Sequence, residues 1–110
     1  MTIEVSDVNG TAVVALSGDV DLQTSPAVRQ KLLACLETSK RLVADLGAVS
    51  YIDSSGVASL VEAFQVSRKK GAYFALASVS PAAMRVLSLA RLDKVFTIHP
   101  DVTAATAAQG

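Results

Sequence analysis

The sequence is short of the residues that build disulfides, aromatic cores and membrane spans. It has one cysteine, Cys35, so no disulfide can form within the chain. It has no tryptophan, and only 5% of its residues are aromatic against 51% hydrophobic, so alanine, valine, leucine and isoleucine must build its core. No apolar run approaches the roughly 20 residues that a membrane span needs. The N-terminus lacks the features of a signal peptide, so we expect a cytoplasmic protein.

The chain also lacks an excess of charge of either sign. Ten lysines and arginines balance ten aspartates and glutamates. The net charge therefore gives no electrostatic reason to expect binding to nucleic acid or insertion into an anionic membrane. Because domains cluster near about 100–150 residues, we expect residues 1–110 to form one domain.

The common signatures of catalysis are missing as well. The patterns G-x-S-x-G and G-x-x-x-x-G-K do not occur, and the single histidine, His99, lies late in the chain. Asp19, Asp21 and Asp53 have no histidine or cysteine companions, and their oxygens could hold Mg²⁺ only loosely. We therefore predict a chain with no enzymatic activity, no metal site and no cofactor.

Hydrophobic patterns and turn residues predict five strands. The expected strands cover residues 2–8, 11–18, 41–46, 73–78 and 95–98. The first two should form a hairpin, because Asn9 and Gly10 both tolerate positive φ. The later strands are separated by helical segments, which favours parallel crossovers. The fold class predicted is α/β: a mixed, mostly parallel sheet with an N-terminal antiparallel edge strand and about four helices.

Capping residues mark where these helices should begin and end. Ser25 and Ser80, each followed by proline, should start helices, and Gly71 suits the position just after the helix over residues 54–70. The Ala-rich segment after Pro100 should form a short terminal helix. Residues 81–92 are apolar on more than one face. The excess apolar residues there either scatter over the surface or form a patch that faces a partner.

The motif DSSG (residues 53–56) stands where a strand passes into a strongly amphipathic helix. Loops at the carboxyl ends of parallel strands gather at one edge of the sheet. Asp53 should therefore lie near Asp19 and Asp21, which follow the preceding strand. Ser54 would then stand at a helix start among carboxylates.

Two explanations of this junction compete. Serine is a common helix cap, so Ser54 could simply satisfy a backbone amide. Gly56, however, lies just inside the helix, where alanine would be more stable. A glycine there indicates that something approaches the backbone closely.

Three stretches carry a family resemblance. They are VVALSGDVDLQTSPAVRQKL (13–32), RLVADLGAV (41–49) and VSYIDSSGVASLV (49–61). In this order, and with the predicted strands and helices, they resemble the STAS domain of bacterial anti-sigma factor antagonists. The resemblance covers essentially the whole chain, and DSSG entering an apolar helix is its most specific element.

The resemblance implies a phosphorylation switch. Ser54 matches the serine that is phosphorylated by a partner serine kinase, which is also the anti-sigma factor. The unphosphorylated domain sequesters this kinase and so frees a sigma factor, and a serine phosphatase resets the switch. Ser55 is the alternative phosphorylated residue. The partner-binding surface implied by the resemblance contains Asp19, Asp21, Asp53, Ser55 and Gly56.

Other functions stay open at this point. STAS subunits of ABC-type transporters dock on an ATPase and support lipid traffic, often with threonine at the hydroxyl position. The chain could also be a module of a larger sulfate-permease-like or signalling protein, although its elements favour a free-standing domain. The complete DSSG motif together with GDVD (18–21) favours the anti-sigma interpretation. The sequence does not determine the oligomeric state.

Overall fold

Turns and capping residues divide the chain into short strands and helices, which a computed structural model describes over residues 1–109. The strands are β1 (Thr2–Val8), β2 (Thr11–Val20), β3 (Arg41–Ile52), β4 (Tyr73–Ala77) and β5 (Ile98–His99). The helices are α1 (Ser25–Thr38), α2 (Ser54–Lys70), α3 (Pro81–Leu89), the 3₁₀ turn η1 (Leu92–Lys94) and α4 (Val102–Ala107).

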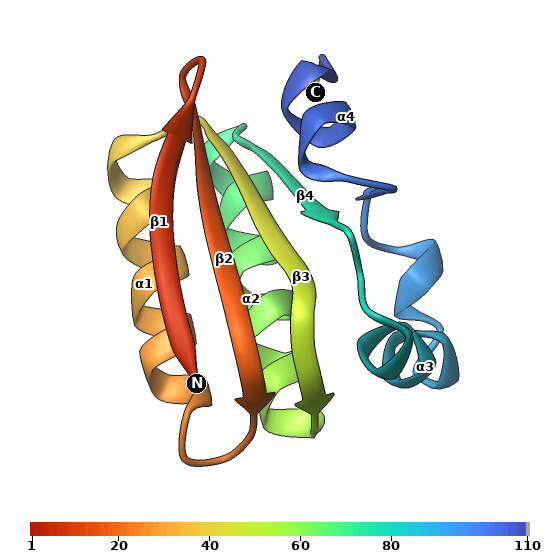
Figure 1. The fold of residues 1–110 in the computed structure, drawn as a ribbon. Coiled ribbons are helices and arrows are strands. Elements are labelled where there is room, and N and C mark those ends of the chain that lie inside the picture. Colours follow the sequence, from red (N-terminus) through yellow and green to blue (C-terminus); the bar gives the residue numbers. More distant parts are fainter. Residues whose placement is uncertain (110) are drawn as a thin grey trace.

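The strands form one mixed sheet in the order β1-β2-β3-β4-β5, as Figure 1 shows for its first four strands. β1 and β2 pair antiparallel through the turn at Asn9 and Gly10, whose φ angles of 52° and 87° are those that the NG pair was expected to adopt. All other neighbouring strands are parallel. The predicted fold class, with its antiparallel edge strand and four helices, is confirmed.

Alternating side chains of the strands point to opposite faces of the sheet and are buried there in two hydrophobic cores. The larger core lies between the sheet and α1, α2 and α3, where Val14, Leu42 and Leu60 are almost fully buried. The smaller one lies under α4, whose Ala105 packs on Val13 and Val43. No helix within residues 1–109 has the length and apolar character needed to cross a membrane.

The apolar side chains of α3 divide between the core and the surface. Ala83 and Leu87 are fully buried in the larger core, whereas Leu89 is 81% exposed. Ser80 caps this helix as predicted, because its hydroxyl accepts a hydrogen bond from the amide of Ala83 at 3.2 Å. Gly71 ends α2 in the left-handed conformation, with φ 66°, which also agrees with the prediction.

The strand bounds differ most from the prediction at β3 and β5, while β2 runs on to Val20 and β4 ends at Ala77. β3 continues to Ile52, where a loop was expected after residue 46, because irregularities in the ladder with β2 let the pairing resume and bury Val49 and Ile52. The last strand is shorter than expected. Residues 92–94 form η1, and the chain pairs with β4 only at Ile98 and His99.

Candidate functional site

The ends of β2 and β3 bring the predicted acidic loops together. Asp19 pairs in register with Tyr51, and Val20 with Ile52, so the two strands stop side by side. The amide of Asp53 donates to the carbonyl of Val20 at 3.1 Å, which continues this pairing past the last residue of β3. Both strands then lead into helices that begin at the same end of the sheet (Figure 1). Asp53 therefore lies beside the loop that carries Asp19 and Asp21.

Asp53 is the N-cap of α2, a place that the capping explanation had given to Ser54. Its Oδ1 accepts from the amides of Ser55 at 2.9 Å and Gly56 at 3.2 Å, and from the Ser55 hydroxyl at 2.5 Å. The pKa of Asp53 lies below its ordinary value, chiefly because the Ser55 hydroxyl donates a hydrogen bond to the carboxylate. Partial burial acts in the opposite direction, and backbone amides, including that of Leu22, lower the pKa further. Asp53 is therefore an ionised cap at neutral pH.

The two serines of the motif lie in different surroundings. Ser54 is the first residue of α2 and is exposed to solvent. Ser55 is only half-exposed, and its hydroxyl is engaged by Asp53. Ser54 is therefore the more accessible of the two hydroxyls to another protein.

Gly56 allows α2 to begin in contact with the end of β2. A Cβ atom at this position would lie 2.7 Å from Cγ1 of Val20, 2.7 Å from Cγ1 of Ile52 and 2.8 Å from the Val20 carbonyl oxygen. The close approach that the sequence indicated is real, but the approaching group is the chain's own strand. Gly56 is buried, so it shapes this surface from below.

Asp19 and Asp21 have different places in the loop after β2. Asp21 is half-buried, and its Oδ1 accepts from the amides of Gln23 at 3.0 Å and Thr24 at 3.1 Å. The Thr24 hydroxyl donates to the Asp19 carbonyl at 2.8 Å, which closes the loop. The Asp19 side chain is exposed. Asp21 thus holds the loop in shape, while Asp19 offers a free carboxylate.

Two exposed apolar side chains near the ends of β2 and β3 were not predicted from the sequence. Leu22 is 75% exposed and Tyr51 is 51% exposed. Leu22 follows Asp21 in the loop, and Tyr51 lies beside Asp19 in the ladder. A leucine between polar loop residues, and a tyrosine next to serine near a strand end, were the available signals. Large exposed apolar side chains beside a candidate site are typical of protein-binding surfaces.

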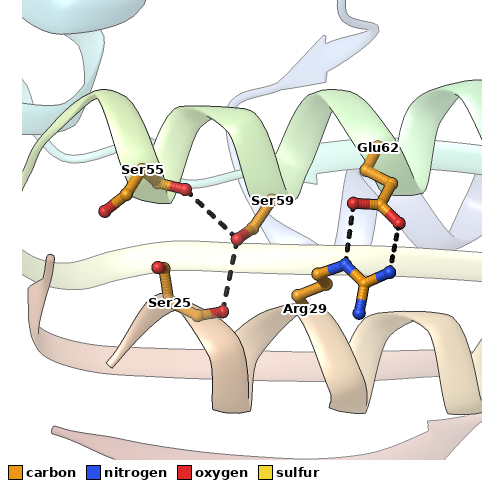
Figure 2. Close-up of polar contacts among 5 residues, drawn as sticks. All are labelled: Ser25, Arg29, Ser55, Ser59 and Glu62. Atoms are coloured by element: carbon orange, nitrogen blue, oxygen red, sulfur yellow. Dashed lines mark hydrogen bonds and ion pairs between the residues drawn. The ribbon is translucent and has the colours of Figure 1, made fainter. Parts of the chain in front are cut away.

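A groove of about 580 Å³ runs between α1 and α2 next to the motif. The buried Ser59 hydroxyl lies 3.2 Å from the carbonyl oxygens of both Ser25 and Ser55. These contacts, drawn in Figure 2, tie the starts of α1 and α2 together. Further along, Arg29 and Glu62 form a two-pronged ion pair with both contacts at 2.7 Å. The hydrogen bond raises the pKa of Arg29 and lowers that of Glu62. This part of the groove is therefore electrically neutral.

The site is built mainly from aspartate and serine side chains. Within residues 1–109, no three side chains of histidine, cysteine, aspartate or glutamate come together in a way that could hold a metal ion. His99 lies in β5 and its Nε2 faces the Tyr73 hydroxyl at 3.3 Å, whereas Ser54 begins α2. The arrangement leaves the Ser54 hydroxyl exposed to solvent.

Comparison with known proteins agrees with this arrangement. A family model described as STAS domain matches residues 2–105. An anti-sigma F factor antagonist of Paenibacillus polymyxa is 28% identical over 101 residues, which cover 90% of this chain and 86% of the relative. A crystal structure of an anti-sigma factor antagonist from Mycobacterium paratuberculosis has a TM-score of 0.85 and 33% identity, and the match covers 96% of this chain and 90% of that one.

One further structure shares the fold at lower identity. It is the Bacillus cell fate determinant SpoIIAA in the phosphorylated form, with a TM-score of 0.76 and 18% identity. The match covers 98% of this chain and 100% of that one. The fold described above is therefore one that has been observed in a phosphorylated protein.

Proposed function

This chain belongs to the STAS domain family, and from that premise we propose that it is an anti-sigma factor antagonist switched by phosphorylation of Ser54. In the unphosphorylated form it binds an anti-sigma factor that is also a serine kinase, and so frees a sigma factor in the cytoplasm. Phosphorylation releases the kinase, and a serine phosphatase restores the binding form. The chain is a substrate and a binding partner in this scheme. The kinase supplies the nucleotide, the Mg²⁺ and the base.

The observation that carries the proposal is the position of Ser54. Its exposed hydroxyl stands at the first turn of a helix whose start is held by the Asp53 cap and by contact with Val20. The relatives reported above are named as anti-sigma factor antagonists, which supports the same function. SpoIIAA has the same fold and has been observed in a phosphorylated form, so the fold is compatible with phosphorylation.

The electrostatics of the site favour a change in binding over a change in fold. A phosphate adds about −1.5 to −2 charges, and a helix N-terminus stabilises an anion by roughly 0.3–1 kcal/mol. A carboxylate about 6 Å away would repel each added unit charge by up to roughly 3 kcal/mol at an effective dielectric constant near 20. Because the buried side chains of α2 hold it on the sheet, we expect the phosphate to alter the surface and leave the scaffold intact.

The surface around Ser54 defines what the partner must offer. Leu22, in the loop after β2, and Tyr51, which pairs with Asp19 in the ladder, provide exposed apolar area near the Asp19 carboxylate. A complementary partner would present an apolar pocket with basic or amide groups around it. A phosphate placed at the centre of this contact would have to be desolvated, and a loss of about 3–4 kcal/mol weakens binding several hundredfold.

Phosphorylation by a cognate anti-sigma factor kinase tests the assignment directly. The wild type, Ser54→Ala and Ser55→Ala are each incubated with kinase and ATP, and their intact masses are measured. The wild type and Ser55→Ala should gain about 80 Da, the mass of one phosphoryl group, whereas Ser54→Ala should gain nothing. Loss of the gain only in Ser55→Ala would assign the switch to the other serine.

Kinase binding provides the second test. Ser54→Ala should bind the kinase about as well as the wild type, and Ser54→Asp should bind at least about 100-fold more weakly in calorimetry. Equal affinity of Ser54→Asp and the wild type would refute the switch.

A further inference from the structure

A second hollow lies at the other end of α2, away from Ser54. It has a volume of about 400 Å³ and is bounded by the last turns of α2, the start of β4 and the segment that contains β5 and α4. We call it the α2–β4 hollow. Its volume is within the range of small-molecule sites, about 300–1,000 Å³. The residues that matter below are Phe64, Arg68, Tyr73, Phe74, Thr97 and His99.

Aromatic side chains gather around this hollow in a chain that has very few of them. The sequence contains three phenylalanines and two tyrosines, and Phe64, Tyr73 and Phe74 line the hollow. Phe96 packs edge-on against Phe64 and Phe74, with ring centroids 5.6 and 6.2 Å apart, and so supports them from behind. The walls can therefore hold the flat face or edge of another aromatic ring.

The charge of the hollow is unbalanced. The Arg68 guanidinium lies over the Phe64 ring, 5.7 Å from its centroid, and none of the lining residues carries a carboxylate. Within residues 1–109, Arg68 has no acidic partner at ion-pair distance, whereas Arg29 in the α1–α2 groove is neutralised by Glu62. The α2–β4 hollow thus has an arginine without an acidic partner among residues 1–109, whereas the arginine of the α1–α2 groove is paired with a glutamate.

We propose that the α2–β4 hollow binds a small aromatic carboxylate. The Arg68 guanidinium would donate charge-assisted hydrogen bonds to the carboxylate, and the ring would pack against the half-buried rings of Phe64 and Tyr73. A carboxylate matches the planar guanidinium of Arg68, which lies over an aromatic ring. The proposal does not depend on phosphorylation of Ser54, because the residues that carry it belong to the opposite end of α2.

Titration with indole-3-acetate, followed by amide chemical shifts of the full chain, tests this proposal. Tryptophol serves as the uncharged analogue with the same ring. The variant Arg68→Gln removes the charge and leaves a shorter polar side chain at an exposed position. Lys69→Gln, at the exposed neighbouring position, is the matched control for net charge and helix end. Thermal unfolding of both variants confirms that they fold as the wild type does.

Indole-3-acetate should shift the amides of Phe64, Ala72 and Thr97 in a saturable way and leave those around Ser54 unchanged. Arg68→Gln should bind it about tenfold more weakly, tryptophol should bind about tenfold more weakly to the wild type, and Lys69→Gln should bind as the wild type does. Equal binding by Arg68→Gln and Lys69→Gln, equal binding of tryptophol, or no saturable shift up to about 10 mM would overturn the proposal.

Discussion

At its first turn α2 packs against the ends of β2 and β3, whereas the last residues of α2, Arg68, Lys69 and Lys70, are exposed. Both ends contain a glycine, but for different reasons. Gly56 is required because a Cβ would collide with Val20 and Ile52, whereas nothing lies within 4 Å of a Cβ built on Gly71, whose φ of 66° is what favours glycine. The first end is thus determined by packing and the second by backbone conformation.

The two ends of α2 also carry charges of opposite sign. The first turn is capped by ionised Asp53, and the last turn carries Arg68, Lys69 and Lys70. Both arrangements complement the helix dipole. The acidic end is also the one with exposed Leu22 and Tyr51, so charge and apolar area coincide there. The proposed switch residue Ser54 therefore lies at the end of α2 that is held by both a cap and close packing.

Substitution of Gly56 gives the largest expected effect. Gly56→Ala should destabilise the fold by about 3 kcal/mol, because the added methyl group must displace a backbone carbonyl as well as two side chains. Urea-induced unfolding followed by circular dichroism measures the loss. A loss well below that figure would show that α2 can move away from β2 at little cost.

The matched substitution at the other end should cost less. Gly71→Ala forces alanine into a left-handed conformation with open space around it, which costs about 1 kcal/mol. The same unfolding experiment applies. If both alanine variants lose equal stability, the distinction between a packing glycine and a conformational glycine fails.

Two serines at helix starts sharpen the comparison. Ser80 is buried, caps α3 and donates to the Val49 carbonyl at 2.7 Å, so Ser80→Ala should cost about 1–2 kcal/mol. Ser54 is exposed and is not the cap of α2, so Ser54→Ala should change stability by less than about 0.5 kcal/mol. A large loss for Ser54→Ala would mean that its hydroxyl has a structural role.

The smallest expected effect is a dependence on pH at the acidic end. The pKa of Asp53 is lowered in the folded protein, chiefly by the Ser55 hydroxyl. Its contribution to stability is therefore fully present above the unfolded value near about 4 and is lost as pH falls through the lowered folded pKa. The stability difference between wild type and Asp53→Asn should accordingly narrow below about pH 4.

Ser55→Ala provides the control for this prediction. Because it removes the main cause of the shift, the pKa of Asp53 followed by carboxyl-carbon NMR should move back toward its ordinary value. An unchanged titration in Ser55→Ala would assign the shift to the backbone amides instead.

Most of the fold could be predicted from the sequence because local signals agreed with the final packing. The Asn9-Gly10 turn, the cap at Ser80 and Gly71 after α2 each depend on neighbours within a few residues. The end of β3 and the short β5 could not be predicted. They depend on pairing with β2 and β4, and the irregularities that extend the β2–β3 ladder leave no clear pattern along the chain.

The candidate site could be predicted in its location but not in its details. Parallel strands ending together place Asp19, Asp21 and Asp53 at one end, which strand order alone implies. Which residue of the motif caps α2 is decided by side-chain geometry, because aspartate and serine are both good caps. What lies beside Gly56 is a tertiary contact, and the sequence alone could not distinguish a partner from the chain's own β2.

The hydrogen bond from the Asp53 amide to the Val20 carbonyl has a consequence for the time scale of motion at this site. It makes Asp53 the last protected amide of the central ladder, so its exchange with deuterium should require opening of β2 from β3. A partner that approaches the next residue therefore meets a surface that is already ordered, and association should not be slowed by a search among loop conformers.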